Sequence, residues 1–123
     1  MMAELQSEVY EISMLLDFYG QLLTESQYNV MDMHYNQDLS LTELAEALQI
    51  TRQGAHDFIK RGKKQLLDFE EKLGLLARFR EARTQLESLQ EDFQLLDRSE
   101  MEGGNAYLLD QIEEKLYKII SDL

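Results

Sequence analysis

The sequence contains no proline and no cysteine, and only six of its 123 residues are glycine. Because proline breaks helices and is common in the turns of sheets, its absence favours an all-α fold. The absence of cysteine excludes disulfides, thiolate metal sites and cysteine nucleophiles. It also fits a reducing compartment.

Long hydrophobic runs are missing as well. No stretch approaches the roughly 20 consecutive apolar residues that a membrane-spanning helix needs. Residues 1–16 carry acidic side chains where a secretory signal peptide requires basic ones. We therefore expect a cytoplasmic protein that does not associate with a membrane. The length and a hydrophobic content of 44% suffice for one domain of several packed helices.

Positive charge is scarce and unevenly distributed in this chain, whose formal net charge is −12. Residues 1–51 contain nine acidic residues and no lysine or arginine, and residues 84–123 contain ten acidic and three basic residues. Residues 52–83 contain nine basic and five acidic residues, and five of these bases lie between Arg52 and Lys64. DNA would therefore bind at this basic segment. The acidic remainder would weaken binding to non-specific DNA.

The basic segment overlaps a pattern of two short helices, SLTELAEALQITRQGAHDFIKR, from Ser40 to Arg61. Ser40 and Glu43 form a capping box that starts the first helix. Thr51 is an N-cap candidate for the second helix, whose apolar positions recur at helical spacing: Ala55, Ile59, Gly62 and Leu66. Two short helices joined by about three residues, with basic and amide side chains on the second, are typical of a DNA-binding helix-turn-helix.

The second of these helices supplies the candidate nucleic-acid contacts: Arg52, Gln53, His56, Asp57, Lys60, Arg61, Lys63 and Lys64. Gln53 could pair with adenine, and Arg52 or Lys60 with guanine or a phosphate group. The bases from Lys60 onward are better placed to hold backbone phosphates. Asp57 either accepts a hydrogen bond from a cytosine amino group or lowers the affinity. The alternative interpretation is a solvated polar face of a helical bundle.

Before this motif, apolar spacing predicts a helix from about Glu4 to Leu22, and Thr24 with Gln27 forms a second capping box. The helix that this box starts ends near Tyr35, where a polar break follows. The helix that begins after Thr51 has no stop signal before Gly74 and is expected to be about six turns long.

After Gly74 the apolar spacing becomes regular. Residues 75–96 and 109–123 alternate spacings of four and three on either side of the turn Glu102-Gly103-Gly104-Asn105, which predicts an antiparallel hairpin. We expect its first helix to be longer by more than two turns. The chain therefore divides into a helix-turn-helix head at residues 1–74 and a C-terminal interaction arm at residues 75–123, with six helices in all and no flexible linker. The regular spacing and the pairing of DNA-reading helices favour a homodimer.

No pattern of catalytic residues or metal ligands is evident. The only histidines, His34 and His56, lie on different expected helices. His34 and Asp38 have a spacing that two metal ligands could have, but no third ligand is evident. The carboxylates show no pairing suited to acid–base catalysis, and Gly103-Gly104 lacks the strand and the lysine of a phosphate-binding loop. The sequence predicts a protein that is not an enzyme, with no metal, no cofactor and no small-molecule substrate.

Three segments, taken in order, resemble one known family. LLDFYGQLLTESQ, MDMHYNQDLSLTELAEALQITRQGAHDFIKR and LLDFEEKLGLL cover most of Met14–Leu76 and are similar to the YlxM family of small bacterial proteins. The resemblance implies an all-α dimer whose helix-turn-helix is like region 4 of sigma factors. It also implies a regulatory or accessory role in the signal recognition particle pathway. Gln49 departs from the glycine that such motifs favour in the turn, which predicts a left-handed backbone or a different turn geometry there.

Two functions follow from these observations. The first is a dimeric helix-turn-helix protein that binds DNA through Arg52–Lys64 and regulates genes of the signal recognition particle pathway. The second is an accessory protein that uses the same scaffold to bind the signal recognition particle GTPase or its RNA, without reading a DNA sequence.

Overall fold

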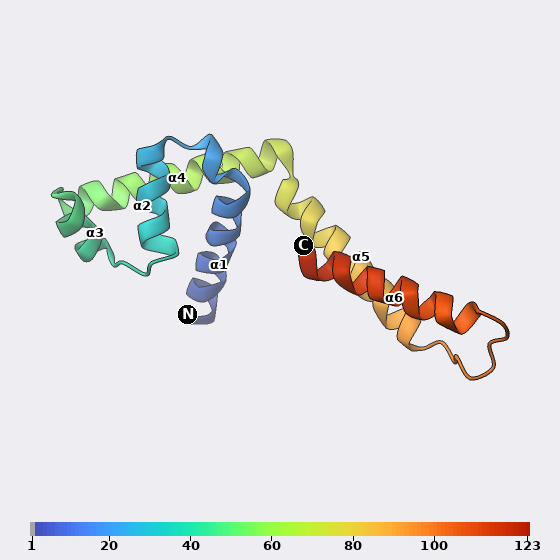
Figure 1. The fold of residues 1–123 in the computed structure, drawn as a ribbon. Helices are drawn as coiled ribbons and strands as arrows, with labels where there is room; N and C mark the ends of the chain where they lie inside the picture. The colour runs from blue at the N-terminus through green and yellow to red at the C-terminus, as the bar shows by residue number, and fades with distance from the viewer. Residues whose placement is uncertain (1) are drawn as a thin grey trace. The chain divides into compact units, whose positions relative to one another are not determined.

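The computed structural model describes the backbone of residues 2–123 and the side chains of residues 7–123. Over these residues the regular elements are six α-helices and one short 3-10 helix, so the all-α prediction is confirmed (Figure 1). The elements are α1 (Met2–Tyr19), η1 (Gly20–Leu22), α2 (Glu25–Tyr35), α3 (Leu41–Leu48), α4 (Arg52–Leu73), α5 (Leu75–Gln94) and α6 (Asn105–Asp122). Across this described part of the chain, no helix is both long and apolar enough to cross a membrane.

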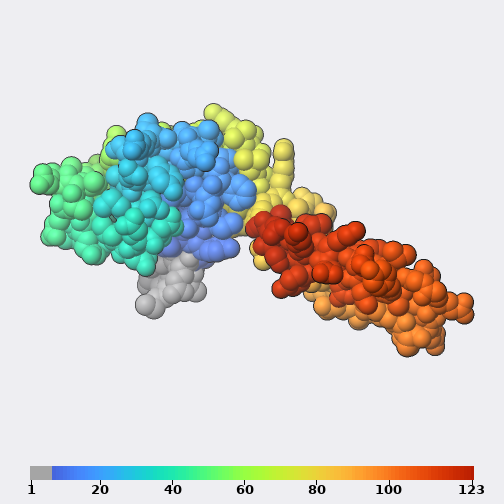
Figure 2. All heavy atoms as spheres, in the orientation of Figure 1, coloured from blue at the N-terminus to red at the C-terminus, as the bar shows by residue number. Residues whose placement is uncertain are grey.

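The chain divides into two compact units, Met1–Leu76 and Ala77–Leu123. In the first unit α1, α2 and α3 all contact α4, and α1 (blue), α2 (cyan) and α3 (green) form one continuous body in the space-filling view (Figure 2). Its core contains residues from all four helices: Ile12, Leu15, Leu16, Tyr19, Val30, Met31, Leu44, Ala45, Ala55, Ile59 and Leu66. The four predicted apolar positions of α4 are all buried. The helix spacing of the sequence therefore identified the inner face of α4.

α2 and α4 pack closely at Gly62. A Cβ atom there would lie 2.5 Å from Met31 Sδ and 2.6 Å from Gln27 Nε2, so only glycine fits without displacing these side chains. Gln27 uses Nε2 to donate a hydrogen bond of 3.1 Å to the carbonyl of Phe58. Thr24 caps α2 by accepting from Gln27 N, as expected. The reciprocal half of that capping box does not form, because the Gln27 side chain is directed to α4 instead.

α4 ends at Gly74, as predicted, and α5 starts at the next residue. Gly74 has a φ of 63°, the left-handed conformation that glycine adopts without steric cost. The N–H groups of Leu75 and Leu76 donate to Tyr19 Oη and Glu70 Oε1, each at 3.0 Å. The first turn of α5 is thus capped by side chains of α1 and α4.

The second unit contains α5 from Ala77 onward and all of α6. The two helices run in opposite directions and are joined by residues 95–104 (Figure 1). The expectation that the first helix would be more than two turns longer is wrong, because α5 has 20 residues and α6 has 18. α5 ends before Asp97, whose Oδ1 accepts hydrogen bonds from the backbone N–H and the hydroxyl of Ser99. Such local side-chain bonds compete with the helical backbone bonds and favour a turn.

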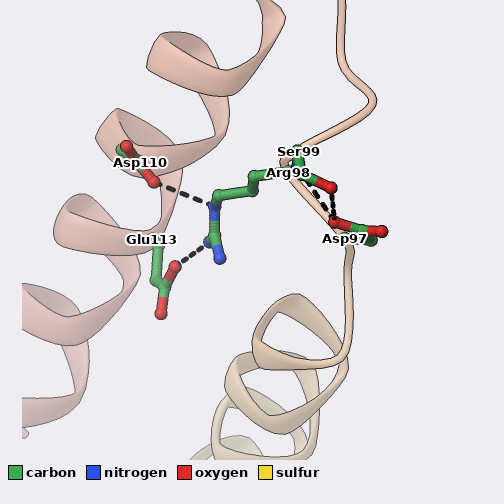
Figure 3. A network of polar contacts seen from close by, with 5 residues as sticks. All are labelled: Asp97, Arg98, Ser99, Asp110 and Glu113. Atoms are coloured by element: carbon green, nitrogen blue, oxygen red, sulfur yellow. Dashed lines mark hydrogen bonds and ion pairs between the residues drawn. The ribbon is translucent and has the colours of Figure 1, made fainter.

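Arg98 attaches this loop to α6 (Figure 3). Its Nη2 forms an ion pair and hydrogen bond with Glu113, and its Nε lies 2.9 Å from Asp110 Oδ1. The Nε–H is not aligned for a hydrogen bond to that oxygen, so the contact with Asp110 is electrostatic. One guanidinium group therefore lies close to two carboxylates of α6 and offsets part of their negative charge.

Candidate nucleic-acid interface

The turn between α3 and α4 sets the position of the candidate reading helix. α3 starts with the predicted capping box, in which Glu43 N donates to Ser40 Oγ and Ser40 N donates to Glu43 Oε1, both at 3.1 Å. Gln49 follows α3 with φ 55° and ψ 45°, so of the two alternatives predicted for this position the left-handed backbone is the one observed. A non-glycine residue there costs roughly 1–2 kcal/mol of conformational energy.

Backbone hydrogen bonds offset that cost. Ile50 N donates to Ala45 O at 3.0 Å and Gln49 N donates to Glu46 O at 3.3 Å, which is the pairing of a Schellman motif. Thr51 then caps α4 by accepting from Gly54 N at 2.9 Å. The turn therefore holds α3 and α4 in the arrangement of a helix-turn-helix.

Seven of the eight candidate contacts are exposed on α4: Arg52, Gln53, His56, Asp57, Lys60, Arg61 and Lys64. Their side chains divide into three groups by their contacts. Arg52, Lys60 and Lys64 form no ion pair or hydrogen bond with any side chain that the structure describes, which leaves three cations open to an anionic partner. Arg61 lies over the ring of Phe58, with 5.4 Å between its Cζ and the ring centroid.

The third group is centred on Asp57. Gln53 Nε2 donates a hydrogen bond of 3.0 Å to Asp57 Oδ1, and His56 Nδ1 lies 3.7 Å from the same oxygen. Gln53 and Asp57 are four residues apart on one helix face, a spacing at which amide and carboxylate side chains commonly pair. The sequence contained this signal, although we expected Gln53 to remain free for adenine.

Lys63 is the candidate that the structure places apart from the others. Its Nζ forms an ion pair with Glu8 of α1, and the two side chains are 36% and 43% exposed. A contact between Lys63 and a phosphate group, which stays a prediction, would require this pair to open. Glu8 lies 55 positions away in the sequence, and no local pattern pointed to it.

The histidines show no metal-binding arrangement, and the described residues include no group of three or more histidine and acidic side chains that could hold a metal ion. His34 Nδ1 lies 2.7 Å from the carbonyl of Leu39, which is a hydrogen bond across the loop between α2 and α3. Its ring packs edge-on against Tyr35. These contacts indicate that His34 stabilises the loop between α2 and α3.

Comparison with known proteins places this arrangement in a family. The model of the UPF0122 family, described as "Putative helix-turn-helix protein, YlxM / p13 like", matches residues 6–106. A UPF0122 protein of Acetivibrio thermocellus is 43% identical over 113 residues, which are 92% of this chain and 97% of that protein. A UPF0122 protein of Desulforamulus reducens is 46% identical over 90 residues, 73% of this chain and 74% of that protein. The chain therefore belongs to the UPF0122 family of YlxM/p13-like helix-turn-helix proteins.

Proposed function

We propose that this protein binds DNA through the exposed face of α4 and acts in the cytoplasm as a transcription regulator, with genes of the signal recognition particle pathway as its targets. The observation that carries the proposal is a set of three cations, Arg52, Lys60 and Lys64, that have no ion-pair partner among the described side chains. They lie on the second helix of a helix-turn-helix. Phosphate contacts from such cations orient a reading helix, and side chains near its N-terminus then contact base edges.

The charge distribution supports weak, salt-sensitive binding rather than tight non-specific binding. α4 carries the basic segment, whereas residues 1–51 and 84–123 are strongly acidic. Because DNA is repelled by the acidic surfaces, only a duplex whose bases complement α4 should be held at physiological salt.

A mobility-shift assay with a randomised duplex pool, run over a series of salt concentrations, tests the proposal. The full chain should enrich a defined sequence at low salt. The double variant Lys60→Glu/Lys64→Glu should lose binding, whereas the control Lys115→Glu/Lys118→Glu, with the same charge change on exposed lysines of α6, should retain it. Failure to enrich any sequence at low salt would exclude DNA reading.

The protein is proposed to act as a homodimer through the arm. Regular apolar spacing on α5 continues through Ala82 and Leu89, which remain exposed, while Leu86 and Phe93 are half-buried. On α6 Leu116 is buried, but Ile112 is 46% exposed. The hairpin therefore covers only part of its apolar surface, and a second hairpin would complete a four-helix arrangement. A dimer would also present two reading helices, the usual arrangement for two DNA half-sites.

A second candidate function, an accessory role in which the protein binds the signal recognition particle GTPase or its RNA, is favoured by the surface of the second unit. Tyr107 and Tyr117 are 67% and 63% exposed, and aromatic side chains are enriched in protein interfaces. Direct titration of the purified GTPase and its RNA with the full chain tests this function. Binding that survives Lys60→Glu/Lys64→Glu but is lost in Tyr107→Ser/Tyr117→Ser would support it. No binding of either component would exclude it.

A further inference from the structure

The hydrogen-bond acceptors near the start of α4 bear on which DNA base this helix contacts, in addition to whether it binds DNA. Gln53 and Asp57 lie in the first two turns after the Thr51 cap, on the exposed face. The hydrogen bond from Gln53 Nε2 to Asp57 Oδ1 fixes the two side chains against each other.

This bond changes what Gln53 can read. Bidentate recognition of adenine by an amide requires Nε2 to donate to N7 while Oε1 accepts from N6. In the structure one of the two N–H groups of Nε2 donates to Asp57 Oδ1, which restricts how the amide group can turn toward a base. Asp57 Oδ2 has no hydrogen bond to any residue that the structure describes. The carboxylate of Asp57 therefore keeps one oxygen free as an acceptor, and the Gln53 amide keeps its second N–H.

Acceptors in the major groove can be satisfied only by the amino groups of cytosine and adenine. Guanine and thymine present acceptors at the equivalent positions, which would repel a carboxylate. When a carboxylate accepts from N6 of adenine, its second oxygen faces the N7 acceptor and is repelled. When it accepts from N4 of cytosine, its second oxygen faces a C–H group and is not repelled. A carboxylate is therefore best matched by cytosine.

We propose that Asp57, supported by Gln53, is the specificity-determining residue of α4 and selects cytosine in the DNA strand that it faces. This inference rests on the DNA binding proposed above. A carboxylate desolvated in the groove without a donor is unfavourable, so Asp57 lowers the affinity for every duplex that lacks a cytosine at this position. The same residue would add selectivity to an interface with few cations.

The test is a sequence selection from a randomised duplex pool with the full-length protein and three variants. Asp57→Ala removes the acceptor, and Asp57→Asn replaces it with an amide that can bind adenine at two atoms. Asp68→Asn is the matched control, because it removes one acidic charge from an exposed position further along α4. Circular dichroism establishes that each variant is folded before selection.

The wild-type protein and Asp68→Asn should select cytosine at one fixed position. Asp57→Ala should lower the preference for cytosine at that position about tenfold and leave the other positions unchanged, and Asp57→Asn should shift the preference there to adenine. Unchanged base preferences in both Asp57 variants would overturn the inference while leaving the proposed DNA binding intact. So would an equal gain in affinity for all sequences, because Asp57 would then only repel phosphate. If the wild-type protein selects no sequence, the proposed function fails and this inference fails with it.

Discussion

The hydroxyl of Tyr19, at the end of α1, donates a hydrogen bond of 2.6 Å to Glu70 Oε1 near the end of α4. Tyr19 is fully buried, and its ring also packs against Phe69 with 5.9 Å between the ring centroids. The same hydroxyl accepts from Leu75 N, while Glu70 accepts from Leu76 N. One contact between two side chains therefore joins the end of α1 to the junction of α4 and α5.

Tyr19→Phe should destabilise the first unit. The substitution keeps the ring but removes the hydroxyl, which leaves the N–H of Leu75 without its acceptor and Glu70 without one donor. Loss of a buried hydrogen-bond partner costs about 1–3 kcal/mol, so the free energy of unfolding in urea should fall by that amount. Tyr10→Phe is the control, because Tyr10 is 62% exposed on α1. Equal stability of the two variants would contradict the role of the hydroxyl.

The same tyrosine should make stability depend on alkaline pH. Burial, and then the hydrogen bond to Glu70, raise the pKa of Tyr19 above its ordinary value of 10.0. Because the folded state holds this proton more tightly than the unfolded state, its contribution is complete below pH 10.0 and is lost as the pH rises through the folded pKa. Urea unfolding at several pH values should show a steeper alkaline loss of stability for the wild type than for Tyr19→Phe. Parallel curves would exclude this linkage, since the two proteins differ only in the hydroxyl of residue 19.

Local sequence signals were sufficient for most helix boundaries. The capping box at Ser40, the cap at Thr51 and the glycine at position 74 each act within one or two turns, and all three mark the observed helix ends. For Gln49 the sequence left two alternatives, a left-handed backbone or a different turn geometry, and the structure has the left-handed backbone. The relative lengths of α5 and α6 were predicted wrongly, because the apolar spacing runs to residue 96 although α5 ends at Gln94, and it begins at residue 109 although α6 begins at Asn105.

Side-chain contacts between different helices could be predicted less well from the sequence. Lys63 pairs with Glu8, and Gln27 bonds to the carbonyl of Phe58, across gaps of 55 and 31 positions. Such pairs depend on how α1 and α2 pack on α4, which apolar spacing alone does not define. The bond between Gln53 and Asp57 lies within one helix and was therefore accessible from the sequence.

Lys60 and Lys63 should respond differently to removal of their charge. Lys60→Met should make the slope of log K against log salt shallower by about 0.9 for each protomer bound, because one phosphate contact is lost. If the ion pair with Glu8 stays closed on DNA, Lys63→Met should leave that slope unchanged. It should lower the free energy of unfolding by about 0.5 kcal/mol, since it breaks this partly exposed pair. Salt titrations of DNA binding and urea unfolding of both variants make the comparison. A slope change in Lys63→Met equal to that in Lys60→Met would show that the pair opens on DNA.

Gly62→Ala should destabilise the protein although alanine favours helices. The new methyl group would overlap Met31 Sδ and Gln27 Nε2, and Met31 is fully buried. Overpacking of this kind costs about 1–3 kcal/mol, more than the roughly 1 kcal/mol that alanine contributes over glycine in a helix. Thermal and urea unfolding should therefore show a loss of stability. Gly104→Ala is the control, because no atom lies within 4 Å of its added Cβ. A stabilised Gly62→Ala variant would mean that α2 and α4 leave room for a methyl group between them.

Leu89→Lys should dissociate the proposed homodimer. Leu89 is 46% exposed on α5 and belongs to the apolar surface that the hairpin leaves uncovered. A lysine at this exposed position should change the stability of a monomer little, but its charge would be buried and lose its hydration in a four-helix dimer. Sedimentation at micromolar concentration should therefore shift from dimer to monomer. Leu22→Lys is the matched control, because Leu22 is 56% exposed in the first unit, outside the arm. Because two linked heads bind two half-sites cooperatively, Leu89→Lys should also weaken binding to a paired site while leaving binding to a single half-site unchanged. A wild-type protein that sediments as a monomer, or a Leu89→Lys variant that remains dimeric, would exclude this surface as the dimer interface.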